Sequence, residues 1–370
     1  MEDGMGFLVA SDDRIKQGKV TDVYFERVTE SLAKRGINPL VSMEVRTGSL
    51  PDGWPWAVFS GLEEVLELLE GLPVEVSAMN EGEIFGPGEP VFSVTGRYLD
   101  FGVFETAILG LVCQASGIAT SAARCKVAAG ERAVISFGAR RMHPAIAPMI
   151  ERNAFIGGCD GVAVVESAQR IGEKPSGTMS HSLILCARDE RLAFEMFDEA
   201  MPGDVPRVAL IDTFQDEKFG ALFAAEVLGD RLYAVRLDTP GSRRGDFQKI
   251  IEEVRWELDL RGLSHLKLFV SGDLDEKKIL EYNRVADAYG VGTHISNSPV
   301  VNFAMDIVEI DGEPLAKRGK ESALKQLWRC TSDGCRTLAP ASRGEVSCPE
   351  CGGPTEPMLK PVFRQGKLLG

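Results

Sequence analysis

The chain has 370 residues, of which 44% are hydrophobic and 26% charged, so it has ample material for buried cores and is not a disordered chain. Its formal net charge of −14 argues against a protein built to coat nucleic acid or anionic lipid. No apolar run reaches the roughly 18 residues of a membrane span, and residues 1–10 lack the basic and apolar regions of a signal peptide. We therefore expect a cytoplasmic protein of two or three domains.

The first part of the chain predicts a mixed α/β domain over residues 1–130. A helix is expected near residues 22–35, and another where Leu62, Val65, Leu66 and Leu69 repeat with helical spacing. Strands are expected at 74–78 and 91–95, on either side of a turn rich in Gly and Pro. Small apolar residues over 104–129 predict one or two tightly packed linking helices.

Strand-like and helical segments then alternate, which predicts βαβ units and a parallel sheet. The expected strands are 133–137, 207–211, 233–237, 267–270 and 288–290, and the clearest helices are 216–228 and 246–260. The stretch is short for a complete eightfold barrel, which takes about 250 residues. We expect an irregular parallel α/β barrel over residues 131–316.

Two of the loops that follow these strands favour a phosphate site. Residues 271–275 (SGDLD) and 291–294 (VGTH) contain glycine, which lets backbone N–H groups approach phosphate oxygens. Functional residues of βα barrels lie at the carboxyl ends of strands, and a phosphate site at the last strands is common. Ordinary turns and helix caps are the alternative.

Charged side chains also gather at the predicted strand ends. The arginines are Arg140, Arg141, Arg236, Arg243 and Arg244. Arginine binds carboxylates and phosphates bidentately, although any one of them could form a surface salt bridge instead. Asp238 is suited to ribose hydroxyls or Mg²⁺, or to pairing with a neighbouring arginine. His181 lies in a Ser/Thr-rich loop, where an imidazole is either structural or a nucleophile.

The C-terminal segment, residues 317–370, carries a cysteine cluster and a basic charge. Cys330, Cys335, Cys348 and Cys351 form two pairs, and four thiolates favour a tetrahedral, structural Zn²⁺ in a small ribbon. The segment has ten Lys/Arg and five Asp/Glu. Docking on an acidic body or a neighbouring subunit is the expected role of these cations, and nucleic-acid contact is the less favoured one.

Several ordered motifs together carry a family resemblance. They are TDVYF at 21–25, SFGARR at 136–141, GTMSHS at 177–182, VRLDT at 235–239, SGDLD at 271–275 and GVGT at 290–293. In these motifs the chain resembles nicotinate phosphoribosyltransferases, in particular the shorter archaeal-type enzymes with a C-terminal zinc module. The resemblance runs from about residue 21 to the end.

The resemblance implies a homodimer with shared active sites and a role for each matched residue. Tyr24 would stack on the pyridine ring in the partner's pocket and Phe137 on its other face. Arg140, Thr178 and Arg236 would hold nicotinate or phosphate oxygens, with Asp160 near the base and Thr239 in the substrate site. Gly272, Asp273, Gly292 and Thr293 would bind the 5′-phosphate. His181 would be phosphorylated by ATP, and Asp238 would act in catalysis.

The implied reaction joins nicotinate to 5-phosphoribosyl-1-diphosphate, with diphosphate leaving together with Mg²⁺ and ATP hydrolysis favouring the product. Quinolinate or nicotinamide as the base are the alternatives, and a zinc-ribbon nucleic-acid-binding protein is the alternative of a different class. One motif departs from the longer family members, which often carry an Asp-Ser-Gly-Asp-like run where residues 238–242 read DTPGS. That departure affects the diphosphate and Mg²⁺ contacts.

Overall fold

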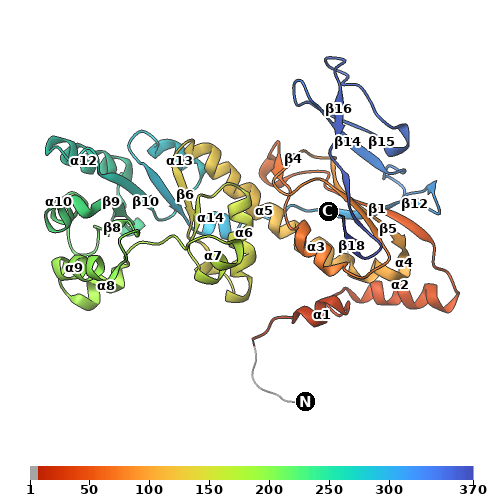
Figure 1. Ribbon diagram of the computed structural model, residues 1–370, viewed down its shortest axis with the longest axis horizontal. Coiled ribbons are helices and arrows are strands. Elements are labelled where there is room, and N and C mark those ends of the chain that lie inside the picture. The colour runs from red at the N-terminus through yellow and green to blue at the C-terminus, as the bar shows by residue number, and fades with distance from the viewer. Residues whose placement is uncertain (1–6, 370) are drawn as a thin grey trace. The chain divides into compact units, whose positions relative to one another are not determined.

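A computed structural model describes residues 7–369, apart from the side chain of Arg244. The chain forms two compact units: residues 1–120 with 299–370, here called the terminal unit, and residues 121–298, the central unit (Figure 1). These two units differ from the expected segments 1–130, 131–316 and 317–370, because the first and last parts of the chain share one unit. The expectation about a signal peptide falls mostly on residues 1–6, which lie outside the described residues.

The terminal unit is built on a seven-stranded sheet in the order β13-β12-β1-β5-β3-β17-β18. Its neighbouring strands pair antiparallel. The strands are β1 (Leu40–Arg46), β3 (Glu75–Ala78), β5 (Pro90–Arg97), β12 (Ala304–Ile310), β13 (Glu313–Pro314), β17 (Lys360–Arg364) and β18 (Lys367–Leu368). Late strands thus complete a sheet begun by early ones, and this is why the two ends of the chain share one unit.

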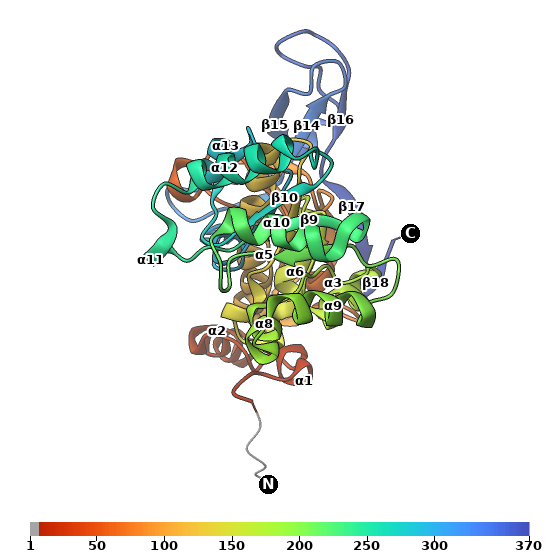
Figure 2. The same cartoon turned by 90° about the vertical axis from the view of Figure 1, so that its left-hand side faces the viewer.

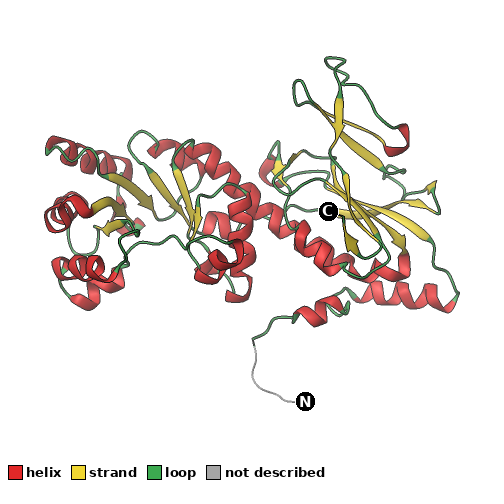
Figure 3. Cartoon of the chain, viewed as in Figure 1, coloured by secondary structure: helices red, strands yellow, loops and turns green. Residues whose placement is uncertain are grey.

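Short helices and a small two-stranded ladder complete this unit (Figure 3). They are α1 (Asp12–Lys16), α2 (Val23–Lys34), η1 (Pro51–Gly53), the pair β2 (Ala57–Val58) and β4 (Ile84–Phe85), α3 (Leu62–Leu68), α4 (Tyr98–Phe101) and η2 (Gly102–Phe104). A large apolar core fills the unit, with side chains such as Phe59, Phe92 and Phe363 almost fully buried. The predicted helices at 22–35 and around Leu62, and the predicted strands at 74–78 and 91–95, are confirmed.

One long helix, α5 (Glu105–Ala129), forms from the stretch of small apolar residues. Gly117 shows why small residues are needed, because a Cβ there would lie 2.3 Å from the carbonyl oxygen of Pro299. Among the described residues, the helical run Tyr98–Ala129 has the length and apolar composition of a membrane span. Half of its most apolar window is buried, and Ile108 and Ile118 pack in the interior, as in the core helix of a globular protein.

The residues before β17 form a three-stranded antiparallel ribbon in the order β15-β14-β16. Its elements are β14 (Lys325–Cys330), β15 (Arg336–Pro340), η6 (Ala341–Arg343) and β16 (Thr355–Pro357). Figure 1 shows it in dark blue.

The central unit contains a six-stranded parallel sheet in the order β7-β6-β11-β10-β9-β8. The strands are β6 (Ala133–Ser136), β7 (Gly161–Val162), β8 (Arg207–Leu210), β9 (Leu232–Leu237), β10 (Lys267–Ser271) and β11 (Ala288–Val291). No pairing between described residues joins β7 to β8, so the sheet is an open half-barrel. The expected parallel α/β architecture is confirmed, and the barrel is incomplete because the described residues contribute six strands to it.

Helices and short turns connect these strands. They are η3 (Ala139–Arg141), η4 (Pro144–Ile146), α6 (Ala147–Ile156), α7 (Val165–Ile171), α8 (His181–Ala187), α9 (Glu190–Ala200), α10 (Glu217–Leu228), η5 (Gly229–Arg231), α11 (Gly241–Arg244), α12 (Phe247–Leu260), α13 (Glu276–Tyr282) and α14 (Thr293–Ser296). Helix α10 packs against β8, β9 and α12 (Figure 2). One face of the sheet carries a small apolar cluster of Val208, Ala234 and Phe269, with Ile135, Phe137 and Ala288 packed against it.

Candidate active site

The carboxyl ends of the parallel strands bring many of the predicted site residues to one edge of the central unit. Phe137 follows β6, Asp238 follows β9, and Gly272 and Gly292 come directly after β10 and β11. Because the strands are parallel and in register, with Ser271 opposite Gly290 and Val291 opposite Ser136, these loops are neighbours. In sheets of this kind, ligands bind at the carboxyl edge.

Arg236 is the central cation of this edge. Its guanidinium Nη1 donates to the hydroxyl of Thr178, and Nη2 donates to Asp238 Oδ2 at 3.1 Å. The side chain is only 13% exposed, and Nε is buried without a hydrogen-bond partner among the described residues. A buried donor without an acceptor is costly, so this guanidinium has spare capacity for an anionic ligand.

Phe137 provides an aromatic face beside Arg236. The guanidinium carbon lies 6.0 Å from the centre of the Phe137 ring, and Phe269 packs edge-on against the same ring at 5.7 Å. Gly290 makes room for the ring, because a Cβ at this position would lie 2.5 Å from Phe137 Cδ2. An aromatic face next to a guanidinium suits a flat ring that carries a negative group.

His181 begins α8 and lies among polar groups from β8 and β9. Its Nδ1 is 3.0 Å from the hydroxyl of Thr213, and its Nε2 is 3.8 Å from Asp238 Oδ2 and 4.0 Å from Asp212 Oδ1. Burial raises the pKa of Asp212, and the nearby imidazole opposes that rise. The half-exposed imidazole is therefore oriented by two carboxylates and one hydroxyl.

The two glycine loops lie beside this cluster. Gly272 and Asp273 both adopt positive φ angles, +86° and +51°. Asp273 points its carboxylate to solvent and pairs with Lys278 at 2.6 Å. The adjacent loop passes through Gly292 to Thr293 at the start of α14. These loops offer backbone N–H groups next to Asp238, whose Oδ1 accepts from the Ser271 hydroxyl at 3.1 Å.

Asp160 is not brought to this edge. It stands at the beginning of β7, where its carboxylate accepts the Val134 N–H at 2.8 Å and pairs with Lys126 at 2.8 Å. That is the amino-terminal edge of the sheet, opposite Phe137. Asp160 precedes its strand and is engaged by Val134 and Lys126, and its expected position near the base stays a prediction.

Thr239 follows Asp238, but its side chain points away from the cluster. It is fully buried, and its hydroxyl donates to Glu217 Oε1 at 2.8 Å. Arg243 lies 3.6 Å from the same Glu217 carboxylate. The Thr239 hydroxyl is engaged by Glu217, and its expected place in the substrate site stays a prediction.

Two other expected residues have exposed side chains. Arg140 lies on η3, next to Phe137 in sequence, and its exposed side chain has no hydrogen-bond or ion-pair partner in the described part of the chain. Tyr24 belongs to the terminal unit, where it is 53% exposed on α2. Both side chains are free to contact a ligand or another protein copy.

Asp212 and Thr213 also belong to this cluster, although neither was predicted as a site residue. They follow the predicted strand 207–211, so the same strand-end rule that selected Asp238 could have found them. Asp212 is buried, its Oδ2 accepts the Asp238 N–H at 3.0 Å, and its Oδ1 has no hydrogen-bond partner among the described residues. A buried carboxylate oxygen of this kind suits a cation or a ligand proton.

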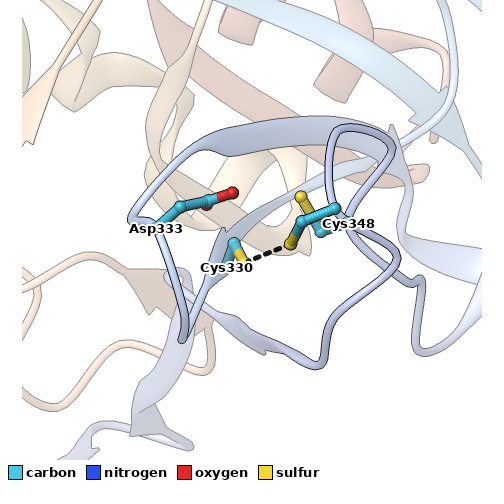
Figure 4. Close-up of side chains that lie close together, drawn as sticks. Cys330, Asp333 and Cys348 are labelled. Atoms are coloured by element: carbon cyan, nitrogen blue, oxygen red, sulfur yellow. Dashed lines mark hydrogen bonds between the residues drawn. The ribbon is translucent and has the colours of Figure 1, made fainter.

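The cysteines of the ribbon converge on one place. Cys330 and Cys351 have sulfur atoms 3.5 Å apart, and Cys335 and Cys348 have sulfur atoms 3.0 Å apart. Cys330, Cys348, Cys351 and the carboxylate of Asp333 form a group that could hold a metal ion, and Figure 4 shows three of these side chains close together. Sulfur atoms around tetrahedral Zn²⁺ lie about 3.8 Å apart, given Zn–S bonds of about 2.3 Å. Both S–S separations here are shorter than this spacing, so the match to Zn²⁺ rests on the donor types, thiolate and carboxylate.

Basic residues of the C-terminal segment pair with acids of the terminal unit. The pairs are Lys320–Asp306 at 2.8 Å, Lys325–Glu44 at 3.2 Å, Arg329–Glu83 at 2.9 Å, Arg336–Glu89 at 2.9 Å and Arg364–Glu75 at 3.2 Å. The prediction that this basic segment docks on an acidic body is confirmed.

Comparison with known proteins places these features in a family. Residues 22–116 match the family described as "Quinolinate phosphoribosyl transferase, N-terminal domain", and residues 118–306 match its C-terminal domain. "Nicotinate phosphoribosyltransferase pncB1" of Mycobacterium tuberculosis is 30% identical over 354 residues, which cover 84% of this chain and 77% of that protein. The relative from Bacillus subtilis, "Nicotinate phosphoribosyltransferase", is 30% identical over 330 residues, covering 79% of this chain and 66% of its own.

Solved structures show the same fold. The "nicotinate-nucleotide pyrophosphorylase from Pyrococcus furiosus" is 54% identical with a TM-score of 0.96, over 98% of this chain and 93% of that one. "Human Nicotinic Acid Phosphoribosyltransferase" has a TM-score of 0.73 at 21% identity, over 95% and 90%. The chain therefore belongs to the quinolinate phosphoribosyl transferase family and is a phosphoribosyltransferase enzyme.

Proposed function

We propose that this enzyme joins nicotinate to 5-phosphoribosyl-1-diphosphate, forming nicotinate mononucleotide and diphosphate in the salvage of pyridine nucleotides. The observation that carries the proposal is the pairing of the Phe137 ring with the Arg236 guanidinium, which Thr178 and Asp238 hold in place. In the reaction the pyridine nitrogen bonds to ribose C1, and the bond from C1 to the diphosphate oxygen breaks. The protein aligns the ring and neutralises the leaving group.

The charge of the site favours a base with one carboxylate. Arg236 already faces Asp238, so only part of its charge remains for a ligand. Arg140 lies three residues after Phe137 in sequence and has no partner among the described residues, so it can add a second cation. One bidentate arginine matches one carboxylate. Quinolinate has two carboxylates and would need more cations, and nicotinamide has no carboxylate to match the remaining charge of Arg236.

The glycine loops are assigned to the 5′-phosphate of the sugar. Gly272, Asp273, Gly292 and Thr293 follow neighbouring strands and offer backbone N–H groups on one side of Asp238. Asp238 is suited to the ribose hydroxyls. Asp238 and the unpaired Asp212 Oδ1 would hold Mg²⁺, which would supply positive charge to the leaving diphosphate.

His181 is assigned to ATP coupling. One imidazole nitrogen takes the γ-phosphoryl group, the bond to ADP breaks, and water later releases the group as inorganic phosphate. The placement of His181 between Thr213, Asp212 and Asp238 supports this role, because a nucleophilic histidine needs groups that fix its ring.

The assembly proposed is a homodimer in the cytoplasm. Tyr24, exposed on α2, enters the partner's base site and stacks opposite Phe137. The terminal ribbon holds a structural Zn²⁺ through Cys330, Cys335, Cys348 and Cys351, as in the archaeal-type enzymes that the chain resembles. The ribbon lies in the terminal unit, whereas the catalytic residues proposed above lie in the central unit.

Transfer to quinolinate is the second candidate, because the matching family takes its description from that activity. Nucleic-acid binding through the ribbon is not favoured, since Arg329 and Arg336 are already paired with acids.

A product assay tests the proposal directly. Purified full-length protein is incubated with 5-phosphoribosyl-1-diphosphate, Mg²⁺ and nicotinate, nicotinamide or quinolinate, each with and without ATP. Nicotinate should give its mononucleotide fastest, with stimulation by ATP. Comparable turnover of nicotinamide, or turnover of quinolinate alone, would replace the proposed base.

A further inference from the structure

Lys278 holds the loop that follows β10. Its ammonium Nζ donates to the carbonyl oxygen of Asp273 at 2.5 Å and to Oδ2 of the same residue at 2.6 Å. The backbone N–H of Lys278 in turn donates to Asp275 Oδ1 at 2.8 Å. Both ends of this one residue are therefore tied to the loop over residues 272–275.

The loop needs such a contact because its backbone is unusual. Gly272 has a φ of +86°, which glycine accepts freely, but Asp273 has a φ of +51°, which is unfavourable for a residue with a Cβ. Two successive positive φ angles turn the N–H groups of the loop in a set direction. The hydrogen bond from Lys278 to the Asp273 carbonyl oxygen fixes the plane of the peptide between residues 273 and 274.

Charge gives a second reason to connect Lys278 with a ligand. The Asp273 side chain is 87% exposed, and an unpaired carboxylate here would repel a phosphate that approached the loop. Lys278 cancels that charge while remaining 30% exposed. An ammonium has three N–H donors, and within the described residues Asp273 accepts two of them, so one remains for a phosphate oxygen.

We propose that Lys278 is a positioning residue for the phosphate monoester of the sugar donor, holding Gly272 and Asp273 in the binding geometry and contributing a cation beside them. The inference rests on the proposed function, since it assigns this loop to the 5′-phosphate. An exposed ion pair between a lysine and a carboxylate adds little to stability. The role of Lys278 is therefore separable from folding.

Steady-state kinetics of the full chain test the inference with Lys278→Ala, Lys278→Arg and Lys277→Ala. Lys277 is the neighbouring lysine on α13 and has no partner among the described residues, so its loss is a matched change of charge. Lys278→Ala should raise KM for 5-phosphoribosyl-1-diphosphate about tenfold, the change that about 1.4 kcal/mol of lost binding produces. The kcat and the KM for nicotinate should change less than about twofold, and Lys278→Arg should restore most of the affinity.

Calorimetric binding of 5-phosphoribosyl-1-diphosphate separates this inference from the proposed function. Wild-type protein that does not bind the donor would overturn both. Equal affinity of wild type and Lys278→Ala for the donor would overturn only the inference about Lys278. The same would follow if Lys277→Ala bound the donor as weakly as Lys278→Ala. If Lys278→Ala does not fold, Lys278→Gln in the Asp273→Asn background replaces it. The two changes together should then lower the affinity for 5-phosphoribosyl-1-diphosphate by less than the sum of their separate effects. Additive losses of affinity would contradict the proposed coupling.

Discussion

Asp212 directs an otherwise unpaired carboxylate oxygen toward His181, with Oδ1 4.0 Å from the imidazole Nε2. The other oxygen of this buried carboxylate accepts the backbone N–H of Asp238 at 3.0 Å, so the group is fixed to the end of β9. A buried carboxylate next to a half-exposed imidazole orients the ring. His181 and Asp212 are thus a unit, with the histidine as the reactive member.

This relationship predicts how phosphate labelling depends on both residues. With ATP labelled at the γ-phosphate, wild-type protein should acquire an acid-labile, base-stable phosphate, and His181→Ala should acquire none. Asp212→Asn should lower the labelling rate at least about tenfold, because the imidazole loses an orienting charge. Asp216→Asn, which changes an exposed carboxylate nearby, should label normally. Equal labelling of wild type and His181→Ala would show that His181 is not the phosphorylated residue and has a structural role.

Mixed dimers test whether Tyr24 serves the partner's site. Tyr24→Ala and His181→Ala should each lack most of the ATP-stimulated activity. When the two are unfolded and refolded together, random pairing should restore about a quarter of wild-type activity, since half the dimers are mixed and each has one intact site. Refolding each variant alone gives no mixed dimers and serves as the control. A fully active monomer in solution would contradict the shared-site arrangement.

The ribbon predicts about one Zn²⁺ per chain by metal analysis. Cys348→Ser should lose the metal and lower the melting temperature, because metal binding contributes to the folding free energy of a small ribbon. The central unit should keep its affinity for 5-phosphoribosyl-1-diphosphate. Cys186→Ser, on α8, removes an exposed cysteine outside the cluster and should retain the metal. Loss of donor binding in a folded, zinc-free variant would show that the ribbon is more than structural.

Glu105 predicts a pH-dependent stability of the terminal unit. Burial, together with the carboxylates of Asp306 and Asp22, raises the pKa of Glu105 to about 7. An acid whose pKa is raised by folding binds more protons in the folded state, so stability falls as pH rises from its unfolded pKa of about 4.3 to about 7. Partial exposure of the carboxyl group moderates the effect.

Thermal melts of Glu105→Gln across this range provide the measurement. The variant should melt at least roughly 2 °C above wild type at pH 8 and close to wild type at pH 4, because the amide cannot ionise. Glu30→Gln, on the exposed side of α2, should track wild type at both pH values. A constant difference between Glu105→Gln and wild type at every pH would refute the assignment.

Local sequence patterns predicted the strands of the central sheet, while long-range pairing escaped them. The apolar runs that became β6, β8, β9, β10 and β11 are each bounded by polar loops, so periodicity located them within one or two residues. The two-residue strand β7 has no such pattern. Strands β12 and β17 joined a sheet begun over 200 residues earlier, at Leu40, and no local pattern predicts that pairing.

The site shows the same division between local and spatial information. The strand-end rule selected Arg236, the Ser/Thr-rich loop drew attention to His181, and the family resemblance added Phe137. The structure gathers polar partners around Arg236 and His181. The rule does not give side-chain direction, so it could not show that the Thr239 hydroxyl points to Glu217. Asp160 precedes its strand and therefore lies at the opposite edge.

The split of the terminal unit sets the order in which the chain can fold during synthesis. The central unit is continuous, so it is complete once residue 298 has left the ribosome. Strand β1 has β5 as an early neighbour but must wait for β12, and β3 must wait for β17. The apolar faces of the early strands therefore remain incompletely covered while the central unit is made. Chains stalled near residue 330 should accordingly contain a protease-resistant segment at 121–298 and a cleavable N-terminal region.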